Sequence, residues 1–419
     1  MNNKLWQSLA NSWKIPELRA KLLFTAAMVA IYRFGCYVPT PGIDIEALEE
    51  FFAKGGAGVV GFLDLFSGGA LGRVAVFALG IMPYITASII MQLLTVVIPK
   101  LEELAKEGEQ GQKVITKYTR WLTVALALMQ SVGYVFLFEQ YNALPDLNYW
   151  RAALIVITLV TGAVAVMWLG ELITARGLGN GMSIMIFISI VSRIPSGTSK
   201  LFTQSPVSIV LFLVVALAVV VAVIWITTGE RRIPVQYAKR VVGRRMMGGQ
   251  STFIPLKVNM AGVIPVIFAS SVMLIPSTFA QFVPGGFSDW LTNALSPSGI
   301  AYLIGEALLI IIFTYFYTAV TFNPIDQADN LKKYGGFVPG VRPGRPTAEF
   351  LDRILTRLTF PGALFLAAIA VLPWFLYRFM DVPFYFGGTS LLIVVGVALD
   401  TMRQMEAQLL MRHYEGFLK

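Results

Sequence analysis

Cysteine and histidine are almost absent from this chain of 419 residues, which contains one of each, Cys36 and His413. One cysteine cannot build an internal disulfide framework or a cysteine-ligated metal site. The single histidine lies in the polar C-terminal segment, so the apolar body has no Ser/His/Asp or Cys/His catalytic group. The phosphate-binding pattern GxxxxGK[ST] is also missing, so ATP hydrolysis would have to come from a partner. We expect no enzyme activity, no catalytic residue, no cofactor and no metal.

Charge is scarce as well. Asp, Glu, Lys and Arg make up 14% of the residues and 56% are hydrophobic, whereas soluble domains contain roughly a quarter charged residues. This composition predicts an integral membrane protein. The N-terminal segment is polar and basic, and the first apolar run contains Arg33 without an obvious small-residue cleavage site, so we expect no removable signal peptide.

Ten apolar runs are long enough to cross a hydrocarbon core about 30 Å thick, which needs roughly 17–25 residues. They cover about 21–38, 74–98, 118–138, 152–172, 181–198, 206–228, 261–283, 300–322, 356–378 and 384–402. The sequence therefore predicts an all-α polytopic membrane protein with ten transmembrane helices.

The distribution of Lys and Arg predicts the orientation, because these residues concentrate in cytoplasmic segments. Placing the N-terminus inside puts 26 of the 33 Lys and Arg on the cytoplasmic side. Both termini are then cytoplasmic. Because the net charge of +9 lies in loops that fix topology, we expect no direct DNA binding.

Ten spans divide into two halves of five, residues 1–198 and 199–419. An odd number of spans per half requires the second half to run inverted relative to the first. Inverted repeats place a pathway along the seam between the halves. The predicted fold is therefore two inverted five-helix halves around a central pathway.

Few ionisable residues fall inside the spans, although coupled transporters usually need them. Arg33 and Glu306 lie in the outer halves of spans, and Glu171 and Asp400 lie near cytoplasmic ends. We interpret all four as snorkelling or interfacial charges. This weakens, without removing, the alternative of an ion-coupled secondary transporter; a membrane insertase without a through-pore is a second alternative.

The second span contains an apolar stripe, since Ile81, Ile85 and Ile89 recur at helical spacing. Such a stripe is ordinary packing or lipid contact in most membrane proteins. Polar residues nearby indicate a seam that is sometimes wet, because they would be ill placed facing lipid. They are Thr86, Ser88 and Gln92 on this span, and Asn259, Ser270 and Ser271 near the seventh.

Two cytoplasmic loops, about 229–260 and 323–355, carry 13 basic residues when Arg357, just past the second loop, is included. In the first loop, valines alternate weakly with basic residues, as in a short hairpin. The second loop has a helix-like piece before a Gly/Pro-rich turn. Positive-inside topology needs only a few charges, so these loops favour docking of a large, negatively charged cytoplasmic partner. Arg342, between prolines and glycines, is suited to bidentate capture of a carboxylate or phosphate.

One stretch, VVGFLDLFSGGALGRVAVF from Val59 to Phe77, begins like a spanning helix. It reaches Ser67-Gly68-Gly69 after only about two turns. A helix this short cannot cross a bilayer, and the residues alone leave its role open.

The chain resembles the SecY family, the large subunits of bacterial protein-conducting channels, nearly end to end. The motifs that carry the resemblance are FSGGALGRVAVFALGIMPYITASIIMQLLTVVIP, EGEQGQKVITKYTR, MWLGELITARGLGNGMSI, AKRVVGRR, IPLKVNMAGVIPVIFASS, TAVTFNPIDQADNLKKYGGFVPGVRPG and VPFYFGGTSLLIVV. The resemblance implies a channel that passes unfolded secretory polypeptides across, and membrane segments laterally into, the inner (cytoplasmic) membrane of a bacterium.

The resemblance also implies site residues. A hydrophobic pore ring would comprise Ile81, Ile85, Met182, Ile186, Ile267 and Ile393. A plug helix, about 60–72, would include Val60, Phe62, Leu63, Leu65, Phe66, Ser67, Gly68 and Gly69, the last three providing a flexible joint. A lateral gate between the second and third spans and the seventh and eighth would include Thr86, Ser88, Gln92, Asn259, Ser270, Ser271 and Ile275. Met182 departs from the branched residue usual in such rings, but methionine is flexible enough to close the same gap.

The partners implied by the resemblance are the SecA ATPase motor, the ribosome, the small membrane subunits SecE and SecG, secretory precursors with signal sequences, and the lipid bilayer. The residues expected to dock the motor or the ribosome are Arg244, Arg245, Lys332, Lys333 and Arg342. The chain departs from many relatives at its end, since EGFLK stops short of a basic tail.

The predicted topology can be tested with single cysteines in a Cys36→Ser background. Cysteines near Gly243 and Gly340 should react with an impermeant thiol reagent only from the cytoplasmic side, and one near Gly286 only from the other side. The ten-span prediction places both loops in the cytoplasm. Labelling at 243 and 340 from opposite faces would rule it out, because the two loops would then lie in different compartments.

Overall fold

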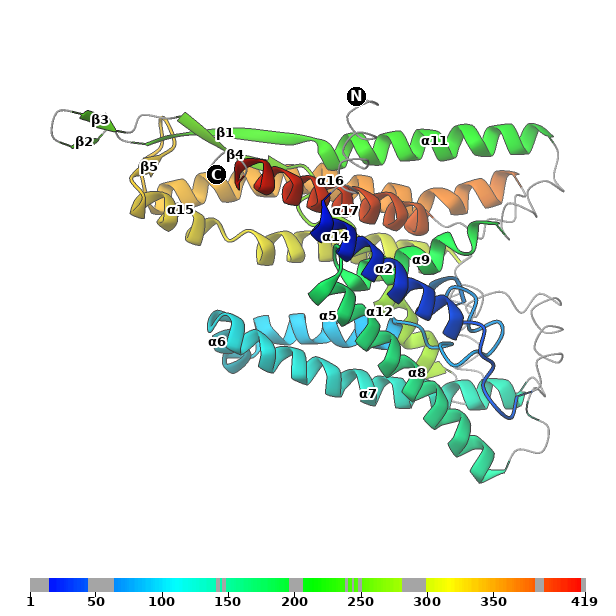
Figure 1. Cartoon of the computed structure of the whole chain (residues 1–419). Coiled ribbons are helices and arrows are strands. Elements are labelled where there is room, and N and C mark those ends of the chain that lie inside the picture. The colour runs from blue at the N-terminus through cyan, green and yellow to red at the C-terminus, as the bar shows by residue number, and fades with distance from the viewer. Residues whose placement is uncertain are drawn as a thin grey trace.

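The computed structural model describes residues 15–43, 64–140, 144, 148–195, 206–237, 240–242, 245–247, 251–280, 299–380 and 388–415. It is a bundle of long helices from one end of which a small antiparallel sheet projects (Figure 1). The predicted boundary between the halves, at 198/199, lies outside the described residues. So do Val60, Phe62, Leu63, Arg244 and the labelling positions Gly243 and Gly286.

Each predicted span overlaps one helix. These helices are α2 (Pro16–Gly35), α5 (Met82–Val97), α7 (Glu109–Gln140), α8 (Tyr149–Arg176), α9 (Gly181–Val191), α11 (Pro206–Thr228), α12 (Ile264–Ala280), α14 (Ile300–Thr321), α16 (Arg345–Met380) and α17 (Gly388–Glu415). By length and composition, four helices in the described part of the chain could cross a membrane. A fifth is added if α5 and α6 (Pro99–Lys106), which are bent by 101° at their junction, form one span. The count of ten spans stays a prediction.

The prediction for the start of the second span was wrong. Helix α5 begins at Met82 rather than near 74, and residues 67–81 form turns apart from one bridge at Ala75. Gly80 has φ +56°, a left-handed conformation that an α-helix cannot contain but glycine adopts without strain. Pro83 then lies at the helix start, where its missing N–H costs nothing. The apolar run is continuous in sequence, but its first third is not helical.

Local capping chemistry explains other helix starts. The Asn180 side chain accepts hydrogen bonds from the N–H groups of Met182 (3.0 Å) and Ser183 (3.3 Å) at the start of α9. Asn323 accepts one from Ile325 N–H (3.0 Å) at the start of α15 (Pro324–Lys333). Both asparagines satisfy donors that have no partner within the helix.

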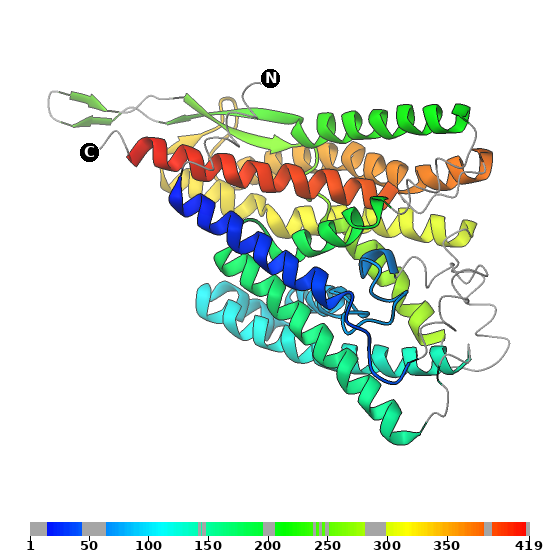
Figure 2. The ribbon, with the colours of Figure 1, turned by 45° about the vertical axis from the view of Figure 1, so that its right-hand side comes forward.

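The loop after α11, predicted to be cytoplasmic, forms a hairpin, as its weak alternation indicated. Strand β1 (Glu230–Tyr237) pairs antiparallel with β4 (Ser251–Lys257) and with β5 (Gly336–Phe337), and β2 (Arg240–Val242) pairs with β3 (Arg245–Met247). Alternate residues of β1, Ile233 and Val235, are buried in a small second core that includes Leu351 of α16. Figure 2 shows that the strands, α6 and α15 lie at the same end of the bundle.

The main hydrophobic core runs through the centre of the bundle and includes residues from α2, α5, α7, α8, α9, α12, α14, α16 and α17. Helix α12 packs against α14, and also against α5 and α7. The core therefore joins the N-terminal and C-terminal helices into one structure.

Candidate functional site

The six predicted ring residues belong to one continuous hydrophobic cluster. Ile81, Ile85, Ile186, Ile267 and Ile393 are buried within it, and Met182 packs against it partly buried. Four helix regions contribute: the start of α5, and α9, α12 and α17. The absence of a side chain at Gly170 allows α8 to pack closely against Ile81 and Met182. A Cβ at this position would lie 3.3 Å from Ile81 Cδ1 and 3.2 Å from Met182 Sδ.

Residues 64–80, which precede α5, form a buried segment between the helices, and we call them the inter-helix segment. Its backbone is paired with the chain that follows α2: Thr40 N–H donates to Val74 O (2.9 Å) and Val76 N–H to Val38 O (2.9 Å). Helix α8 supports it closely, because a Cβ at Gly162 would lie 1.9 Å from Val76 O. Val74 has φ +43°, which a β-branched residue adopts only under constraint from its surroundings.

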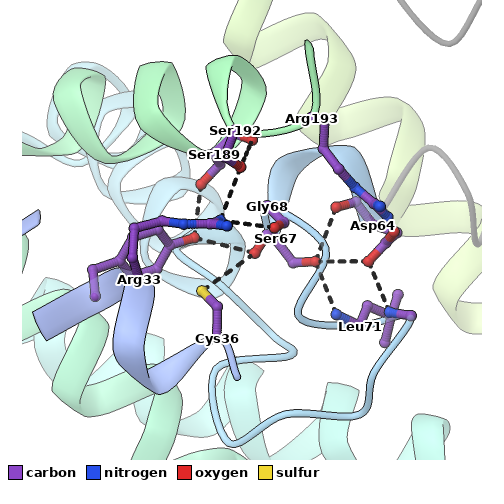
Figure 3. Close-up of polar contacts among 11 residues, drawn as sticks. Arg33, Cys36, Asp64, Ser67, Gly68, Leu71, Ser189, Ser192 and Arg193 are labelled. Atoms are coloured by element: carbon purple, nitrogen blue, oxygen red, sulfur yellow. Dashed lines mark hydrogen bonds and ion pairs between the residues drawn. The ribbon is translucent and has the colours of Figure 1, made fainter. Parts of the chain in front are cut away.

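Helix α2 holds the inter-helix segment by two polar side chains (Figure 3). Arg33 Nη1 donates to Gly68 O (3.0 Å) and to Ser192 Oγ of the α9 C-terminus (2.9 Å). Tyr32 Oη donates its single proton to Ser67 O (3.2 Å) and accepts from Ser189 Oγ, 2.7 Å away. Arg33 and Tyr32 therefore join three parts of the chain: α2, α9 and the inter-helix segment.

Asp64 organises the segment from within. Its Oδ1 accepts from Gly72 N–H (2.7 Å), and its backbone carbonyl accepts from Ser67 Oγ (3.0 Å). Its other oxygen, Oδ2, forms an ion pair with Arg193, immediately after α9. The Asp64 side chain is 3% exposed, so the arginine compensates a carboxylate that has lost most of its water.

Figure 3 shows Asp64 and Arg193 on one side of Gly68, and Arg33 on the other. Gly68 (φ +67°) and Gly69 (φ +89°) supply the left-handed conformations of this turn. We call the contacts of Tyr32, Arg33, Asp64 and Arg193 the polar latch. Ser67-Gly68-Gly69, expected to be a flexible joint, is anchored by the latch in this conformation.

Cys36 lies directly beneath the latch. Its thiol is fully buried, and its Sγ donates a weak hydrogen bond to Ser67 O at 3.8 Å. The native cysteine is therefore covered by the inter-helix segment, and its reactivity reports whether that segment is in place.

The predicted gate residues occupy several environments. Thr86, Ser270 and Ser271 are buried. The hydroxyls of Thr86 and Ser271 donate to carbonyls of their own helices (3.0 and 2.8 Å), and Ser270 Oγ lies 3.0 Å from Val266 O and 3.1 Å from Glu306 Oε1. Ser88 is half-buried and Gln92 exposed. Asn259 lies in a cavity with Tyr317 and Asp400. Ile275 lies in α12, and its side chain is outside the description. Helix α12 nevertheless packs against α5 and α7, so two sides of the expected gate meet.

The predicted docking residues that are described lie at the end of the bundle with the sheet. Lys332 and Lys333 are exposed in the last turn of α15. Arg342 is exposed in a turn flanked by Gly340 (φ +83°) and Gly344 (φ +97°), and its carbonyl accepts from Thr347 Oγ1 (2.7 Å). Arg245 lies on β3, and its side chain is outside the description.

The structure bears on two of the charged residues. Arg33 is half-buried: its Nη1 donates to Gly68 O and Ser192 Oγ within the bundle, and its Nη2 donates to Tyr37 Oη in an exposed contact (3.1 Å). Its interfacial position stays a prediction. The interpretation of Glu306 as a snorkelling or interfacial charge was wrong, because its side chain is 4% exposed and accepts from Ser270 Oγ at 3.1 Å, which joins α14 to α12.

Sequence reasoning missed the roles of Tyr32, Asp64, Ser189, Ser192 and Arg193. One signal was available: Asp64 is a lone acid within an apolar stretch, and Arg193 is a basic residue on the side predicted to be poor in Lys and Arg. An acidic residue in an apolar stretch and a basic residue on the side poor in Lys and Arg are both unusual, and such residues often pair with one another.

The geometry defines a class of protein: a helical membrane protein with a large apolar cluster in its core and a polar-anchored segment packed between its helices. Solved structures share this fold. A SecY structure described by its plug domain's role in the closed channel has a TM-score of 0.64 at 19% identity, covering 95% of this chain and 96% of that one. Sec61 in the canine ribosome-channel complex has a TM-score of 0.61 at 17% identity, with the same coverage.

Sequence comparison gives the family. The SecY family profile matches residues 75–402. The protein translocase subunit SecY of Streptomyces scabiei is 49% identical over 434 residues, covering 98% of this chain and 99% of the relative. That of Corynebacterium glutamicum is 48% identical over 438 residues, covering 98% and 100%. The chain belongs to the SecY family.

The latch can be tested through Cys36. Replacing Asp64 by alanine leaves Arg193 without its carboxylate and should favour displacement of the inter-helix segment. Removing one partner of a buried pair costs about 3–5 kcal/mol, so even a third of that cost should raise the rate of Cys36 alkylation about tenfold. The measurement is the rate of labelling by a small maleimide in membranes.

The matched control is Glu349→Ala, which breaks the ion pair with Arg345 on side chains that are 91% and 64% exposed. Exposed pairs contribute little, so this variant should label like the parent. Equal Cys36 labelling in Asp64→Ala and Glu349→Ala would mean that the ion pair does not hold the segment.

Proposed function

We propose that the chain is the large subunit of a protein-conducting channel, passing unfolded secretory polypeptides across, and membrane segments laterally into, the cytoplasmic membrane of a bacterium. The observation that carries the proposal is that six residues from four helix regions belong to or pack against one large apolar cluster, which also contains residues of the latched segment. Family membership supports this function over the transporter and insertase alternatives. The chain itself would perform no catalysis.

The apolar cluster suits a pore that must stay closed to ions. A narrow hydrophobic constriction holds little water, so an ion entering it loses hydration and meets a barrier. The proposed ring draws its side chains from four helix regions, which can part around a moving chain and close after it. Its members are Ile81, Ile85, Met182, Ile186, Ile267 and Ile393. A polar ring would instead hold water and bind the substrate's backbone.

The first part of the inter-helix segment, residues 64–72, is the proposed plug, together with residues 60–63, which lie outside the described part. One solved SecY relative is described as having a plug domain that stabilises the closed state and maintains the membrane seal. In this chain the polar latch would hold the proposed plug between the helices and so keep the channel closed. Because the latch joins the segment to both α2 and α9, separation of these helices would release it.

The proposed lateral gate lies where α12 meets α5 and α7. The hydroxyls of Thr86 and Ser271 donate to their own helices, and that of Ser270 donates to Glu306 of α14, on the same side of the proposed gate. Parting the helices would therefore leave no hydroxyl donor unsatisfied, whether water or lipid enters. This suits a seam through which apolar segments leave for the bilayer.

The remaining proposals concern organisation and partners. We place both termini in the cytoplasm and divide the chain into inverted halves at 198/199. The exposed Lys332, Lys333 and Arg342 support docking of a cytoplasmic partner, with Arg244 and Arg245 proposed from the family motif alone. A solved relative was studied in a ribosome-channel complex, which supports the ribosome as partner. SecA, SecE and SecG follow from the resemblance.

Docking predicts a charge-reversal effect. Arg342→Glu should block motor-driven translocation while the protein remains inserted, because an exposed guanidinium that contacts an acidic partner becomes repulsive; losing such a pair costs about 2–5 kcal/mol if it is desolvated. The measurement is precursor uptake by vesicles at matched expression. Lys100→Glu, which reverses an exposed charge on α6 at the same end, serves as control. Unimpaired uptake with Arg342→Glu would mean that this charge only serves topology.

The ring and the plug together predict ion tightness. Replacing Ile81, Ile85, Ile186, Ile267 and Ile393 by glycine should widen and wet the constriction, and deleting residues 60–72 should remove the second seal. Either change should make resting vesicles conductive, and the combination should leak more than each alone. Precursor transport should survive, because neither element supplies driving force.

Ion flux without translocating substrate is the measurement. Leucine at the same five positions keeps the volume and is the control, expected to stay ion-tight. If the combined glycine and deletion variant is inserted and folded but as tight as the parent, the isoleucines only pack and the segment is no plug.

A further inference from the structure

Helices α7 and α8 are joined by a bidentate ion pair that belongs to neither the proposed ring nor the polar latch. Arg120 Nε of α7 donates to Glu171 Oε1 of α8 at 2.9 Å, and Arg120 Nη2 lies 2.8 Å from Glu171 Oε2. The Glu171 side chain is 18% exposed and that of Arg120 is 53% exposed. Two parallel contacts of this kind fix the relative orientation of the two groups as well as their distance. The pair therefore holds α7 against α8 in one arrangement.

Other polar side chains described on α7 bond within the helix. Its described hydroxyls donate to carbonyls of α7 itself at 2.7–3.0 Å, and they belong to Thr116, Thr119, Thr123 and Ser131. Lys113 pairs with Glu109, one turn away on the same helix. Arg120 differs from all of these, because its guanidinium bonds to a neighbouring helix.

The turn of α8 that carries the paired carboxylate also contacts the proposed ring. A Cβ at Gly170 would lie 3.3 Å from Ile81 Cδ1 and 3.2 Å from Met182 Sδ. The same turn is bonded to the start of α9, because Thr174 Oγ1 accepts from Gly181 N–H at 2.9 Å. The ion pair therefore joins α7 to a turn whose position affects the packing of the ring.

The seam of α12 with α5 and α7 is built differently from the seam between α7 and α8. At the α12 seam, the hydroxyls of Thr86 and Ser271 donate to their own helices, and that of Ser270 donates to α14. These hydrogen bonds stay on one side of the seam, so they survive when it parts. Separating α7 from α8 would instead leave a largely buried carboxylate without its cation, which is costly. We therefore expect α7 to stay on α8 when it moves away from α12.

We propose that Arg120 and Glu171 are positioning residues of the lateral gate, an inference that rests on the proposed function. The pair holds α7 on α8, so that both helices and the ring contacts of Gly170 move as one body when the gate opens against α12. Moving this body disturbs more packing than a movement of α7 alone. The pair therefore also helps to set how apolar a segment must be to leave sideways.

The first measurement is the ratio of membrane-integrated to translocated chains, for precursors that carry a test segment of graded leucine content. Arg120→Gln should allow α7 to move without α8 and raise this ratio about fivefold for a marginally apolar segment. Glu171→Gln should shift it in the same direction. Lys113→Ala is the matched control, because it breaks an exposed pair with Glu109 on the same helix, and it should keep the parental ratio.

Charge exchange separates positioning from a general structural disturbance. The double variant with Arg120→Glu and Glu171→Arg restores opposite charges and should return the ratio close to that of the parent. Arg120→Lys keeps the charge but loses the planar fork, so its ratio should fall between those of the parent and Arg120→Gln. A double variant that departs further from the parent than either single exchange would contradict the proposed pairing.

Spin labels in the full chain test the movement directly, in a Cys36→Ser background. Labels at Leu128 of α7 and Ile157 of α8 report the α7–α8 seam, and labels at Leu128 and Leu308 of α14 report the gate; all three positions are exposed. With a segment stalled in the gate, only the second distance should lengthen in the parent, whereas both should change in Arg120→Gln. A first distance that lengthens in the parent, or a parental integration ratio in Arg120→Gln, overturns the inference. A parent that integrates no segment at any leucine content would instead contradict the proposed function.

Discussion

Polar groups buried between membrane helices must find their partners within the protein, because no water is available to them. The inter-helix segment is subject to this constraint throughout: its turn exposes carbonyls at Ser67 and Gly68 and carries the carboxylate of Asp64 into the bundle. Tyr32, Arg33 and Arg193 satisfy these groups from two helices. The segment can therefore occupy the centre only while α2 and α9 remain in place beside it.

This constraint links the latch to the apolar cluster. Residues of the inter-helix segment, such as Phe66, Leu71 and Val74, belong to the same cluster as Ile81 and Ile186. The apolar contacts make the centre dry, and dryness in turn strengthens the hydrogen bonds and the ion pair of the latch. Opening of the channel would therefore require the apolar cluster and the latch to change together. Water entering the cluster would weaken the latch, and breaking the latch would expose apolar side chains of the cluster.

Much of the fold could be predicted because its signals are local. Long apolar runs indicate the spans, and the positions of Lys and Arg indicate which loops share a side. The strand alternation around Ile233 and Val235 indicated the hairpin. The motif resemblance to SecY contributed the ring residues, whose convergence no local pattern could establish.

The latch could not be predicted because its partners are distant in sequence. Arg33 and Ser192, or Asp64 and Arg193, are joined only by the packing of α2 and α9 around the inter-helix segment. The start of α5 was misplaced for a related reason: the apolar run gives no sign that residues 74–81 are held as turns by the Pro39–Ala75 bridge and by α8. Glu306 similarly became a buried link between α12 and α14 only through its contact with Ser270.

The central claim is that a polypeptide in transit passes through the apolar cluster. Site-specific disulfide cross-linking tests it most directly, with a precursor stalled midway and carrying one cysteine, in a Cys36→Ser background. Cysteine at Ile186 or Ile393 should cross-link to the stalled precursor, whereas cysteine at Leu217, exposed on α11, should not. Cross-linking at Leu217 in place of both cluster positions would contradict the account.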